Sequence, residues 1–594
     1  MSEYFRKYIK KDHFPIQPSQ IKFKTSFKNC ILEAMKKRQW KEGDNDEWDI
    51  NWTEKEFIVE VLEHLNLLNQ QKVNHFRNHY ELTRKDLMTK NIKKYKKVLE
   101  KEGKIEESLT YNFTPLTYQL PCEYSIFCEE FKKVNQISES KQLWIMKPIG
   151  KSQGKGIFIF RNIKDISSWK NQYKYNPDNP SADPYVVQKY ISDPLLIGGK
   201  KFDMRIYALC TSYQPLTIYL YRTGFARFTH HRYDLDDINN VYVHLTNVAI
   251  QKNSDNYDKK LGGKWLLQKL KLFLISKYGQ EKVDYAFFQV QNIIIKSMLA
   301  VQKVIVNDKR CFELYGFDII LDSSLKPWLL EINSSPSMTA NTQQDSELKQ
   351  GILDDTFTII DLEKVLTGQE EQIGGFDLIY KGDIIKLPSN STYNTLLGSY
   401  NNRIQQLKKL AKNTALRLAI QHYEKQQNQI NQSQRIIQSN KVSKNQNQKV
   451  QMLLNNRVKQ NIIINKSGTK SGYAKYNVSK QNNNNISQKG KKQINNQQIN
   501  SQNKIGNSQN EKKQQQLLIN QQKLIKQQQL QNQQQYQFIQ TKLNNSQINK
   551  NNILLEPLNS QNNIEKFERY KNADDQYNKL INLNQKQINL NNDE

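Results

Sequence analysis

The sequence predicts a folded, mixed α/β core of about 400 residues followed by a long tail that does not fold. Residues 401–594 hold 79 Asn or Gln among 194 residues, with 31 Lys or Arg against 9 Asp or Glu, a net charge of +22. Residues 1–400 carry 57 basic and 49 acidic side chains, a net charge of only +8. In that first part, short β-branched and aromatic runs recur from Trp144 to about Ile320 and alternate with helical patterns.

Taken in order, residues 1–140 are expected to form an N-terminal α/β domain with a basic surface helix at Lys85–Lys104. A central domain at 141–265 and a C-terminal domain at 266–402 follow, then a basic helix at 403–426 and a low-complexity, mostly disordered tail at 427–594. The expected strands are WIMKP, GIFIF, YVVQKYI, KFDMRIYALC, LTIYLYR and VYVHLTNV. Helices are expected at Lys264–Tyr278 and Tyr285–Val306, a hairpin at Phe317–Asn333, and helices from there to about residue 426.

Composition also excludes several classes of protein. No run approaches the roughly 18 apolar residues of a membrane span, and MSEYFRKYIKKDHF lacks the features of a secretory signal. The five cysteines include no C-x-x-C pair, which argues against a disulfide framework or zinc site and favours a reducing compartment. We expect a soluble, intracellular protein without a membrane partner. No nucleic-acid-binding motif is present, so the basic charge is expected to attract another polyanion, such as an acidic protein tail.

The strongest chemical signal is the hairpin within Cys311–Met338. If it folds symmetrically about Ser324 and Leu325, Asp318 lies directly opposite Glu331, and Asn333 lies on the same face. Two carboxylates facing each other destabilise a sheet unless a cation lies between them. The oxygen ligands predict a Mg²⁺ site; the alternative is a solvated face with a chance acid pair.

A glycine-rich loop, WIMKPIGKSQGKGIFIF, lies upstream of the hairpin. Gly150, Gly154 and Gly156 would let backbone N–H groups approach a phosphate, with Lys147 and Lys155 supplying charge. The spacing matches neither a Walker A loop nor a Rossmann fingerprint, and alone it is equally compatible with a plain hairpin.

Two strand-like segments extend this pattern. The end of YVVQKYI could hydrogen-bond an adenine edge. In KFDMRIYAL, the charges of Lys201, Asp203 and Arg205 share one strand face, with a solvated face of ion pairs as the alternative. Together these pieces predict a nucleotide held between two β layers.

The chain resembles the tubulin tyrosine ligase-like family of ATP-grasp ligases. The resemblance covers about residues 20–400, and within the family the chain looks most like the ciliary tubulin polyglutamylase branch. The matching stretches are VNHFRNHYELTRKDLMTKN, WIMKPIGKSQGKGIFIF, KFDMRIYAL, GFARF, VHLTNVAIQK, CFELYGFDIILD, PWLLEINSSPS and GGFDLIY. The resemblance implies an ATP-grasp core made of the central and C-terminal domains.

The resemblance also implies roles for individual residues. Catalysis is implied for Arg205, which faces the reacting phosphoryl group, and for Lys147 on the ATP phosphates. The other implied ATP contacts are Gln153, Gly154, Gln188, Lys189, Tyr190, Ile191, Lys201, Phe202, Asp203, Thr246 and Asn247. The implied magnesium ligands are Asp318, Glu331 and Asn333, and the implied glutamate ligands are Arg227, Lys264 and Lys349. Where matching glutamylases commonly carry Tyr-Ser, this chain has Val248 and Ala249. His230, His231 and His244 are expected to be structural or surface residues.

The implied activity is ATP- and Mg²⁺-dependent addition of glutamate to Glu side chains in tubulin tails, through an acyl phosphate. The expected partners are tubulin or microtubules and free glutamate, for a monomer in the cytoplasm, cytoskeleton, and cilium or basal body. A need for accessory subunits stays open. The alternatives are a tubulin glycylase or tyrosine ligase, a non-catalytic microtubule-binding member, and a small-molecule ligase. Residues beyond about 430 are expected to add microtubule affinity, or else to be an appendage without a role.

Overall fold

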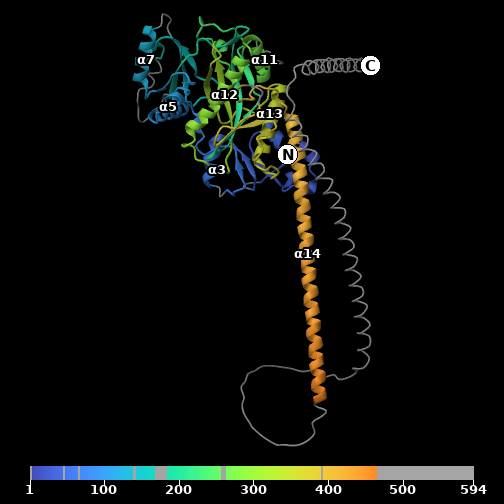
Figure 1. The fold of residues 1–594 in the computed structure, drawn as a ribbon. Helices are drawn as coiled ribbons and strands as arrows, with labels where there is room; N and C mark the ends of the chain where they lie inside the picture. The colour runs from blue at the N-terminus through green and yellow to red at the C-terminus, as the bar shows by residue number, and fades with distance from the viewer. Residues whose placement is uncertain are drawn as a thin grey trace, which may run out of the picture. The chain divides into compact units, whose positions relative to one another are not determined.

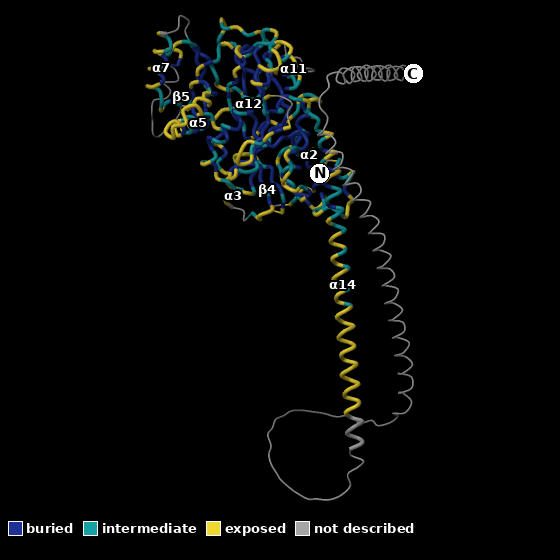
Figure 2. The backbone as a smooth tube through the Cα atoms, viewed as in Figure 1, coloured by how far each residue is buried: buried dark blue, intermediate teal, exposed yellow. Residues whose placement is uncertain are grey.

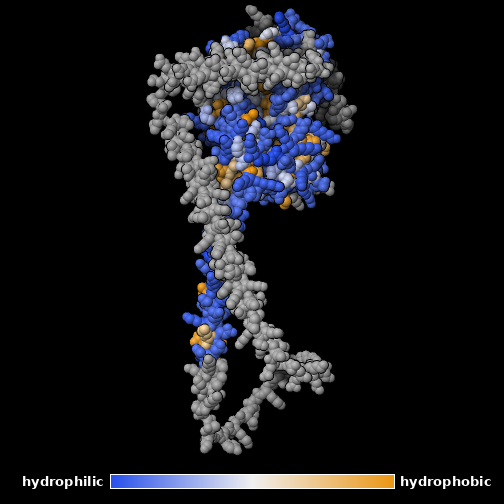
Figure 3. Space-filling model, turned by 90° about the vertical axis from the view of Figure 1, so that its right-hand side faces the viewer, coloured by the Kyte–Doolittle hydropathy of each residue, from blue (hydrophilic) through white to orange (hydrophobic). Residues whose placement is uncertain are grey.

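The computed structural model describes residues 3–44, 47–64, 67–137, 142–166, 184–255, 263–388 and 392–464 (Figure 1). Residues 1–419 form one compact unit and residues 420–594 a second. In the first unit, buried residues follow the strands and exposed residues lie mainly on the outer helices and loops (Figure 2). No helix of the described residues is long and apolar enough to cross a membrane. The face drawn in Figure 3 is mostly hydrophilic where it is described, with small scattered apolar spots.

The N-terminal part contains a parallel four-stranded sheet in the order β2-β1-β3-β4. Its strands are β1 (Lys22–Thr25), β2 (Lys41–Glu42), β3 (Ile50–Trp52) and β4 (Lys72–Val73). Its helices are α1 (Glu3–Tyr8), α2 (Cys30–Lys37), α3 (Ile58–His64), α4 (Tyr80–Thr83), α5 (Lys85–Lys101) and α6 (Ile105–Leu109). The expected basic helix is therefore present as α5, and its apolar residues Ile92 and Leu99 are buried.

A second four-stranded sheet is antiparallel, in the order β5-β8-β6-β7. It forms one wall of the cleft that is described below as the candidate active site. Its strands are β5 (Thr117–Leu120), β6 (Trp144–Pro148), β7 (Phe158–Phe160) and β8 (Tyr185–Lys189), and helix α7 (Tyr124–Ile137) accompanies them. The rings of Phe127 and Trp144 lie 5.1 Å apart, joining α7 to the sheet through aromatic packing. Because β5 pairs with β8, the domain boundary expected near residue 140 falls inside this sheet.

The largest sheet has nine strands around the long strand β10 (Lys200–Tyr213). Its other strands are β9 (Leu196–Ile197), β11 (Leu216–Tyr221), β12 (Phe225–Phe228), β13 (Lys264–Leu266), β14 (Glu313–Leu321), β15 (Pro327–Asn333), β16 (Gln372–Ile373) and β17 (Phe376–Lys381). Helices α11 (Leu267–Tyr278) and α12 (Gln280–Val301) contribute buried residues to the core cluster on this sheet, and α13 (Gln343–Ile360) contributes to another. The boundary expected at 265 also falls within one sheet, because β13 belongs to it.

Two expected elements differ in kind. VYVHLTNV, expected as a strand, forms the short helices α9 (Val241–His244) and α10 (Val248–Gln251), and the Asn240 side chain caps α9 by accepting from the Tyr242 N–H. Helices were expected throughout 334–426, yet β16 and β17 lie there and β17 pairs with β11. Strand β17 depends on a partner more than 150 residues away in sequence, which local patterns do not reveal, and β16 pairs with β17.

Helix α14 spans Arg403–Ile464 and so continues beyond residue 426, where the disordered tail was expected to begin. In the first unit its residues Leu407, Ala411 and Leu418 are buried in a cluster with Phe5 and Ile9. Further along, most of its described side chains are exposed (Figure 2). The rest of the expected tail, 465–594, lies outside the described residues.

Candidate active site

The hairpin β14–β15 places Asp318 opposite Glu331, as the sequence predicted. The symmetry is less simple than expected, since Leu321 pairs with Pro327 beside the turn and the register shifts between Asp318 and Ile319. A β-bulge therefore brings the two carboxylates into register. The Asn333 amide Nδ2 lies 3.3 Å from Glu331 Oε1, so the three oxygen-bearing side chains lie close together on one face.

Asp318 is surrounded by arginine. Arg205, its direct cross-strand neighbour on β10, donates through Nη2 to Asp318 Oδ2 at 3.0 Å. Arg227 Nη2 lies 2.8 Å from the same oxygen, and Arg227 Nε donates to Asp203 Oδ1 at 2.8 Å. Burial alone would raise the pKa of Asp318, but the two guanidinium groups outweigh it and hold that pKa well below its usual range. All four side chains are buried, so the solvated face considered from the sequence is not what forms.

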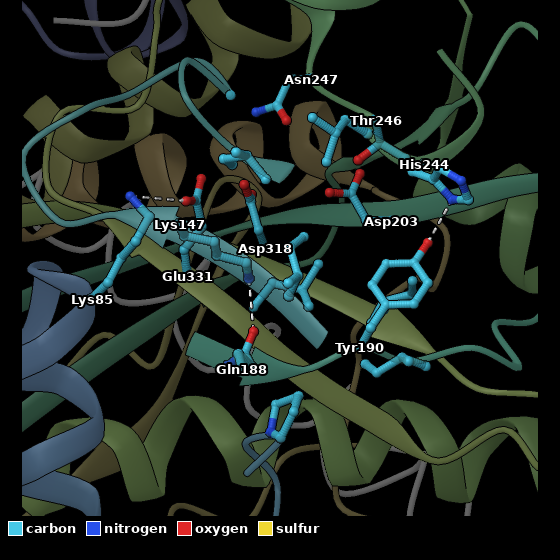
Figure 4. A pocket seen from close by; sticks show the side chains of 18 of the residues that line it. Lys85, Lys147, Gln188, Tyr190, Asp203, His244, Thr246, Asn247, Asp318 and Glu331 are labelled. Atoms are coloured by element: carbon cyan, nitrogen blue, oxygen red, sulfur yellow. Dashed lines mark hydrogen bonds and ion pairs between the residues drawn. The ribbon is translucent and has the colours of Figure 1, made fainter. Parts of the chain in front are cut away.

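Two lysines, Lys147 and Lys201, line a cleft beside these groups, and Figure 4 shows Lys147 with its hydrogen bond to Gln188. Lys147 Nζ donates to Gln188 Oε1 at 2.7 Å, and Lys201 Nζ donates to the Tyr190 hydroxyl at 2.9 Å and to the His244 carbonyl at 3.0 Å. Burial lowers the pKa of Lys147 to about 8 and that of Lys201 to about 7. Neither ammonium group has a carboxylate within ion-pair distance among the described residues, so both can accept an anionic ligand.

The glycine-rich loop covers the cleft in a conformation that depends on glycine. Gln153, Gly154 and Gly156 have φ values of 62°, 81° and 72°. A Cβ atom on Gly154 would lie 2.5 Å from Ile250 Cδ1 and 3.4 Å from Asn247 Oδ1. The loop therefore approaches the Asn247 segment more closely than a side chain would allow.

The cleft between the four-stranded sheet and β10, β14 and β15 has a cavity volume of about 130 Å³. It gathers most of the residues that the sequence singled out. These are Lys147, Gln153, Gly154, Gln188, Lys189, Tyr190, Ile191, Lys201, Asp203, Arg227, Thr246, Asn247, Asp318, Glu331 and Asn333. Arg205 itself does not line the cleft, but it is hydrogen-bonded to Asp318, which does.

Three sequence-based candidates lie elsewhere. Phe202 points to the opposite face of β10 and packs on Phe228 in the core, because strand side chains alternate, so its side chain lies away from the cleft. Lys264 and Lys349 both contact Asp345 Oδ2, at 3.0 and 3.1 Å. Lys264 is the cross-strand neighbour of Arg227, which places this cluster beside the cleft. Lys349 is 3% exposed and therefore is not a surface charge.

Comparison with known proteins agrees with this geometry. The model of the tubulin-tyrosine ligase family matches residues 62–373, which include the whole cleft. A probable tubulin polyglutamylase TTLL9 from Bos taurus is 45% identical over 433 residues, covering 66% of this chain and 93% of that protein. The chain belongs to the tubulin-tyrosine ligase family. Other relatives are a probable tubulin polyglutamylase ttll-9 from Caenorhabditis elegans (45% identical, covering 61% of this chain and 85% of the relative) and a probable alpha-tubulin polyglutamylase Ttll1 from Tetrahymena thermophila (43%, covering 61% and 93%).

Several site residues of this tubulin-tyrosine ligase family member escaped the sequence analysis. Lys85 begins α5, and its Nζ lies 3.8 Å from Glu331 Oε2 (Figure 4). His244, expected to be structural or superficial, lines the cleft and hydrogen-bonds the Tyr190 hydroxyl at 3.0 Å. The apolar lining of Ile145, Leu245, Ile320 and Leu330 was also missed. All of these residues lie in stretches that resemble the family, such as VNHFRNHYELTRKDLMTKN for Lys85 and VHLTNVAIQK for His244, but no local pattern gave them a role.

The donor atoms at this site fit a magnesium ion. Asp318, Glu331 and Asn333 offer carboxylate and amide oxygens, the donors that Mg²⁺ prefers. Glu331 is only partly covered, with Lys85 at 3.8 Å as its nearest cation. Mg²⁺ would share Asp318 with Arg205 and Arg227.

Proposed function

We propose that the chain is an ATP-dependent tubulin polyglutamylase, which joins glutamate to the side-chain carboxylate of Glu residues in tubulin tails. The observation that carries the proposal is the convergence of Asp318, Glu331, Arg205 and two buried lysines in one cleft between two sheets. The relatives are named as probable tubulin polyglutamylases, and this chain aligns with nearly the full length of each of the two. We propose that this two-sheet cleft is an ATP-grasp site.

The cleft has an apolar end suited to the adenine base. Ile145, Tyr190 and Leu245 belong to one buried cluster there, and Ile320 and Leu330 line the other wall. A planar base fits between these layers, and the segment Gln188–Ile191 borders its edge. The phosphates would then reach Lys147, Lys201 and the N–H groups of the glycine-rich loop. The lysines supply positive charge, and the glycines of the loop let the backbone come close to the phosphates.

At the other end the chain's own residues support phosphoryl transfer. Bound Mg²⁺ would be held by Asp318, Glu331 and Asn333 and would supply positive charge at the phosphates. The bond between the γ-phosphorus and its bridging oxygen breaks, and a new bond forms to an oxygen of the acceptor carboxylate. Arg205 neutralises the charge that develops on the transferred group, and loop closure excludes water from the acyl phosphate. The amine of glutamate then attacks the acyl carbon, phosphate leaves, and the amine loses a proton to solvent.

The incoming glutamate carries two carboxylates and needs more than one cation. Arg227 in the cleft and Lys264 beside it on β13 form a row with Asp203 across three strands. Lys349 reaches the same cluster through Asp345. We propose that this row, with Lys349, holds the carboxylates of glutamate. The tyrosine and glycine ligase alternatives would share the ATP site and differ here.

A single experiment tests the activity. The full chain is incubated with ATP, Mg²⁺, purified tubulin and labelled glutamate, glycine or tyrosine in separate reactions, and the tubulin is analysed by mass spectrometry. Glutamate on tail Glu residues is expected. Transfer of glycine or tyrosine instead would replace the proposed activity with that of another ligase. ATP consumption without tubulin would indicate a small-molecule ligase, and no consumption at all would indicate a binding protein. We expect the protein on cytoplasmic microtubules, including those of a cilium or basal body.

A further inference from the structure

Helix α5 carries a row of lysines that the ATP chemistry does not use. Lys90, Lys94, Lys97 and Lys101 are exposed, and their spacing of three or four residues places them along one side of the helix. Figure 2 shows this helix exposed at the edge of the unit. Like charges at such spacing repel one another, and no carboxylate of the described residues lies within ion-pair distance of these four. The helix therefore carries a repulsion that an anionic partner would relieve.

The lysines border a groove and not a flat surface. The groove lies between α5 and strands β5 and β8, holds about 520 Å³, and is also lined by Lys93, Thr117 and Gln119. Its two acids are already engaged. Asp86 accepts from Arg84 Nε at 2.8 Å, and Glu123 accepts from the Gln119 N–H at 2.6 Å and lies 3.9 Å from Lys93. The groove is therefore a basic channel with polar hydrogen-bonding groups along its floor.

The helix that lines the groove also reaches the candidate active site. Its helix begins at Lys85, whose Nζ lies 3.8 Å from Glu331 Oε2 and donates to the Lys151 carbonyl in the glycine-rich loop at 3.3 Å. From Lys101 to Lys85 the helix rises about 24 Å, a distance that an extended peptide of about seven residues spans. A chain lying along α5 would thus bring one of its side chains to the cleft mouth.

We propose that this α5 groove (Lys90, Lys93, Lys94, Lys97 and Lys101) binds an extended, glutamate-rich peptide of the protein substrate and directs one of its carboxylates toward the cleft. The proposal rests on the proposed function for the identity of the substrate. A flexible carboxylate chain fits better than a nucleic acid, because among the described residues no aromatic or Arg side chain lines the groove to stack a base or fork onto a phosphate.

The test compares two charge reversals in the full chain. One variant is Lys90→Glu with Lys97→Glu; the matched control is Lys132→Glu with Lys133→Glu on α7, an equally exposed pair outside the groove. Binding of a fluorescent poly-glutamate peptide of about ten residues is followed by anisotropy, which needs no turnover. The groove variant is expected to bind about tenfold more weakly, and the control to match the parent within about twofold. KM for ATP and for free glutamate should stay unchanged in both.

The outcomes separate this proposal from the proposed function. Equal weakening in both variants, or none in either, would overturn the groove. Stronger competition by an oligonucleotide of equal charge than by unlabelled peptide would overturn the peptide as its ligand. If the parent binds the peptide through the groove but transfers no glutamate to tubulin, the groove stands and the polyglutamylase activity fails.

Discussion

Arg205 on β10 is hydrogen-bonded through two nitrogens to Asp318, its cross-strand neighbour on β14. The arginine expected to face the transferred phosphoryl group thus contacts a carboxylate expected to hold magnesium. In this structure the guanidinium balances the charge of the acid. We propose that Asp318, with Glu331 and Asn333, would hold Mg²⁺, which would supply positive charge beside Arg205.

The first prediction concerns Glu331, the carboxylate opposite Asp318 in the hairpin. Glu331→Gln keeps the side-chain shape but removes one anionic ligand, so ATP turnover should fall by orders of magnitude at ordinary Mg²⁺. High Mg²⁺ should restore part of it. Turnover across a Mg²⁺ titration is the measurement, and thermal unfolding should match the parent. Exposed Glu347→Gln on α13 serves as the control. Turnover near that of the control at ordinary Mg²⁺ would disprove the metal assignment.

The second prediction concerns pH. Because burial lowers the pKa of Lys201 to about 7 and of Lys147 to about 8, both lose protons in the ATP-free protein as pH rises from 7 to 9. ATP requires the charged form, so its affinity should fall by about tenfold per pH unit for each group that must take up a proton.

Stability should change in the opposite direction. Above these pKa values the unfolded chain, with lysine pKa values near 10.5, binds more protons than the folded one, so the free energy of unfolding of the ATP-free protein rises with pH. Calorimetry with a non-hydrolysable ATP analogue in two buffers would measure the proton uptake directly. Binding without proton uptake at pH 8.5 would show that these lysines are not phosphate ligands.

The third prediction concerns the loop. Gly154→Ala should raise KM for ATP about tenfold, because the new methyl group displaces Ile250 beside Asn247 in addition to straining a φ of 81°. Gly103→Ala has a similar φ of 77° with open space around it, so it measures the backbone strain alone. Gly154→Ala should lose at least as much stability as Gly103→Ala, and only Gly154→Ala should lose ATP affinity. Equal KM values in the two variants would contradict a role for the loop in binding ATP.

The fourth prediction concerns the proposed glutamate pocket. Arg227 touches both Asp203 and Asp318, so Arg227→Ala should weaken use of Mg²⁺ and ATP as well as glutamate. Lys264 contacts Asp345 and does not line the cleft that holds Asp318 and Glu331. Lys264→Met should therefore raise KM for glutamate by tens-fold and leave KM for ATP unchanged. Kinetics with each substrate varied separately would show this. Lys277→Met, on the exposed side of α11, is the control, and a Lys264 variant indistinguishable from it would exclude Lys264 from the pocket.

The fifth prediction concerns the tail. A chain ending at residue 430 should fold and modify a short tail peptide normally, but sediment with microtubules more weakly at low salt, because most of the +22 charge is lost. A chain ending at residue 402 should instead lose stability. It lacks buried Leu407, Ala411 and Leu418, and it leaves Asp355 without its partner Arg403 at 2.8 Å. If the chain ending at residue 430 sediments with microtubules as well as the full chain at every salt concentration, the tail does not contribute to microtubule affinity.

The sequence alone predicted most of the candidate residues that line the cleft of this family member. The glycine-rich loop, the alternating charges of β10 and the acid pair of the hairpin are local patterns, and strand alternation and hairpin pairing are set by short-range backbone geometry. The tertiary structure decided what each charge contacts. Lys85 meets Glu331, Arg227 bridges Asp203 and Asp318, and β17 pairs with β11, all through contacts between distant segments that no local pattern encodes. Burial, which sets the pKa values of Lys147 and Lys201, is likewise a property of the packed chain.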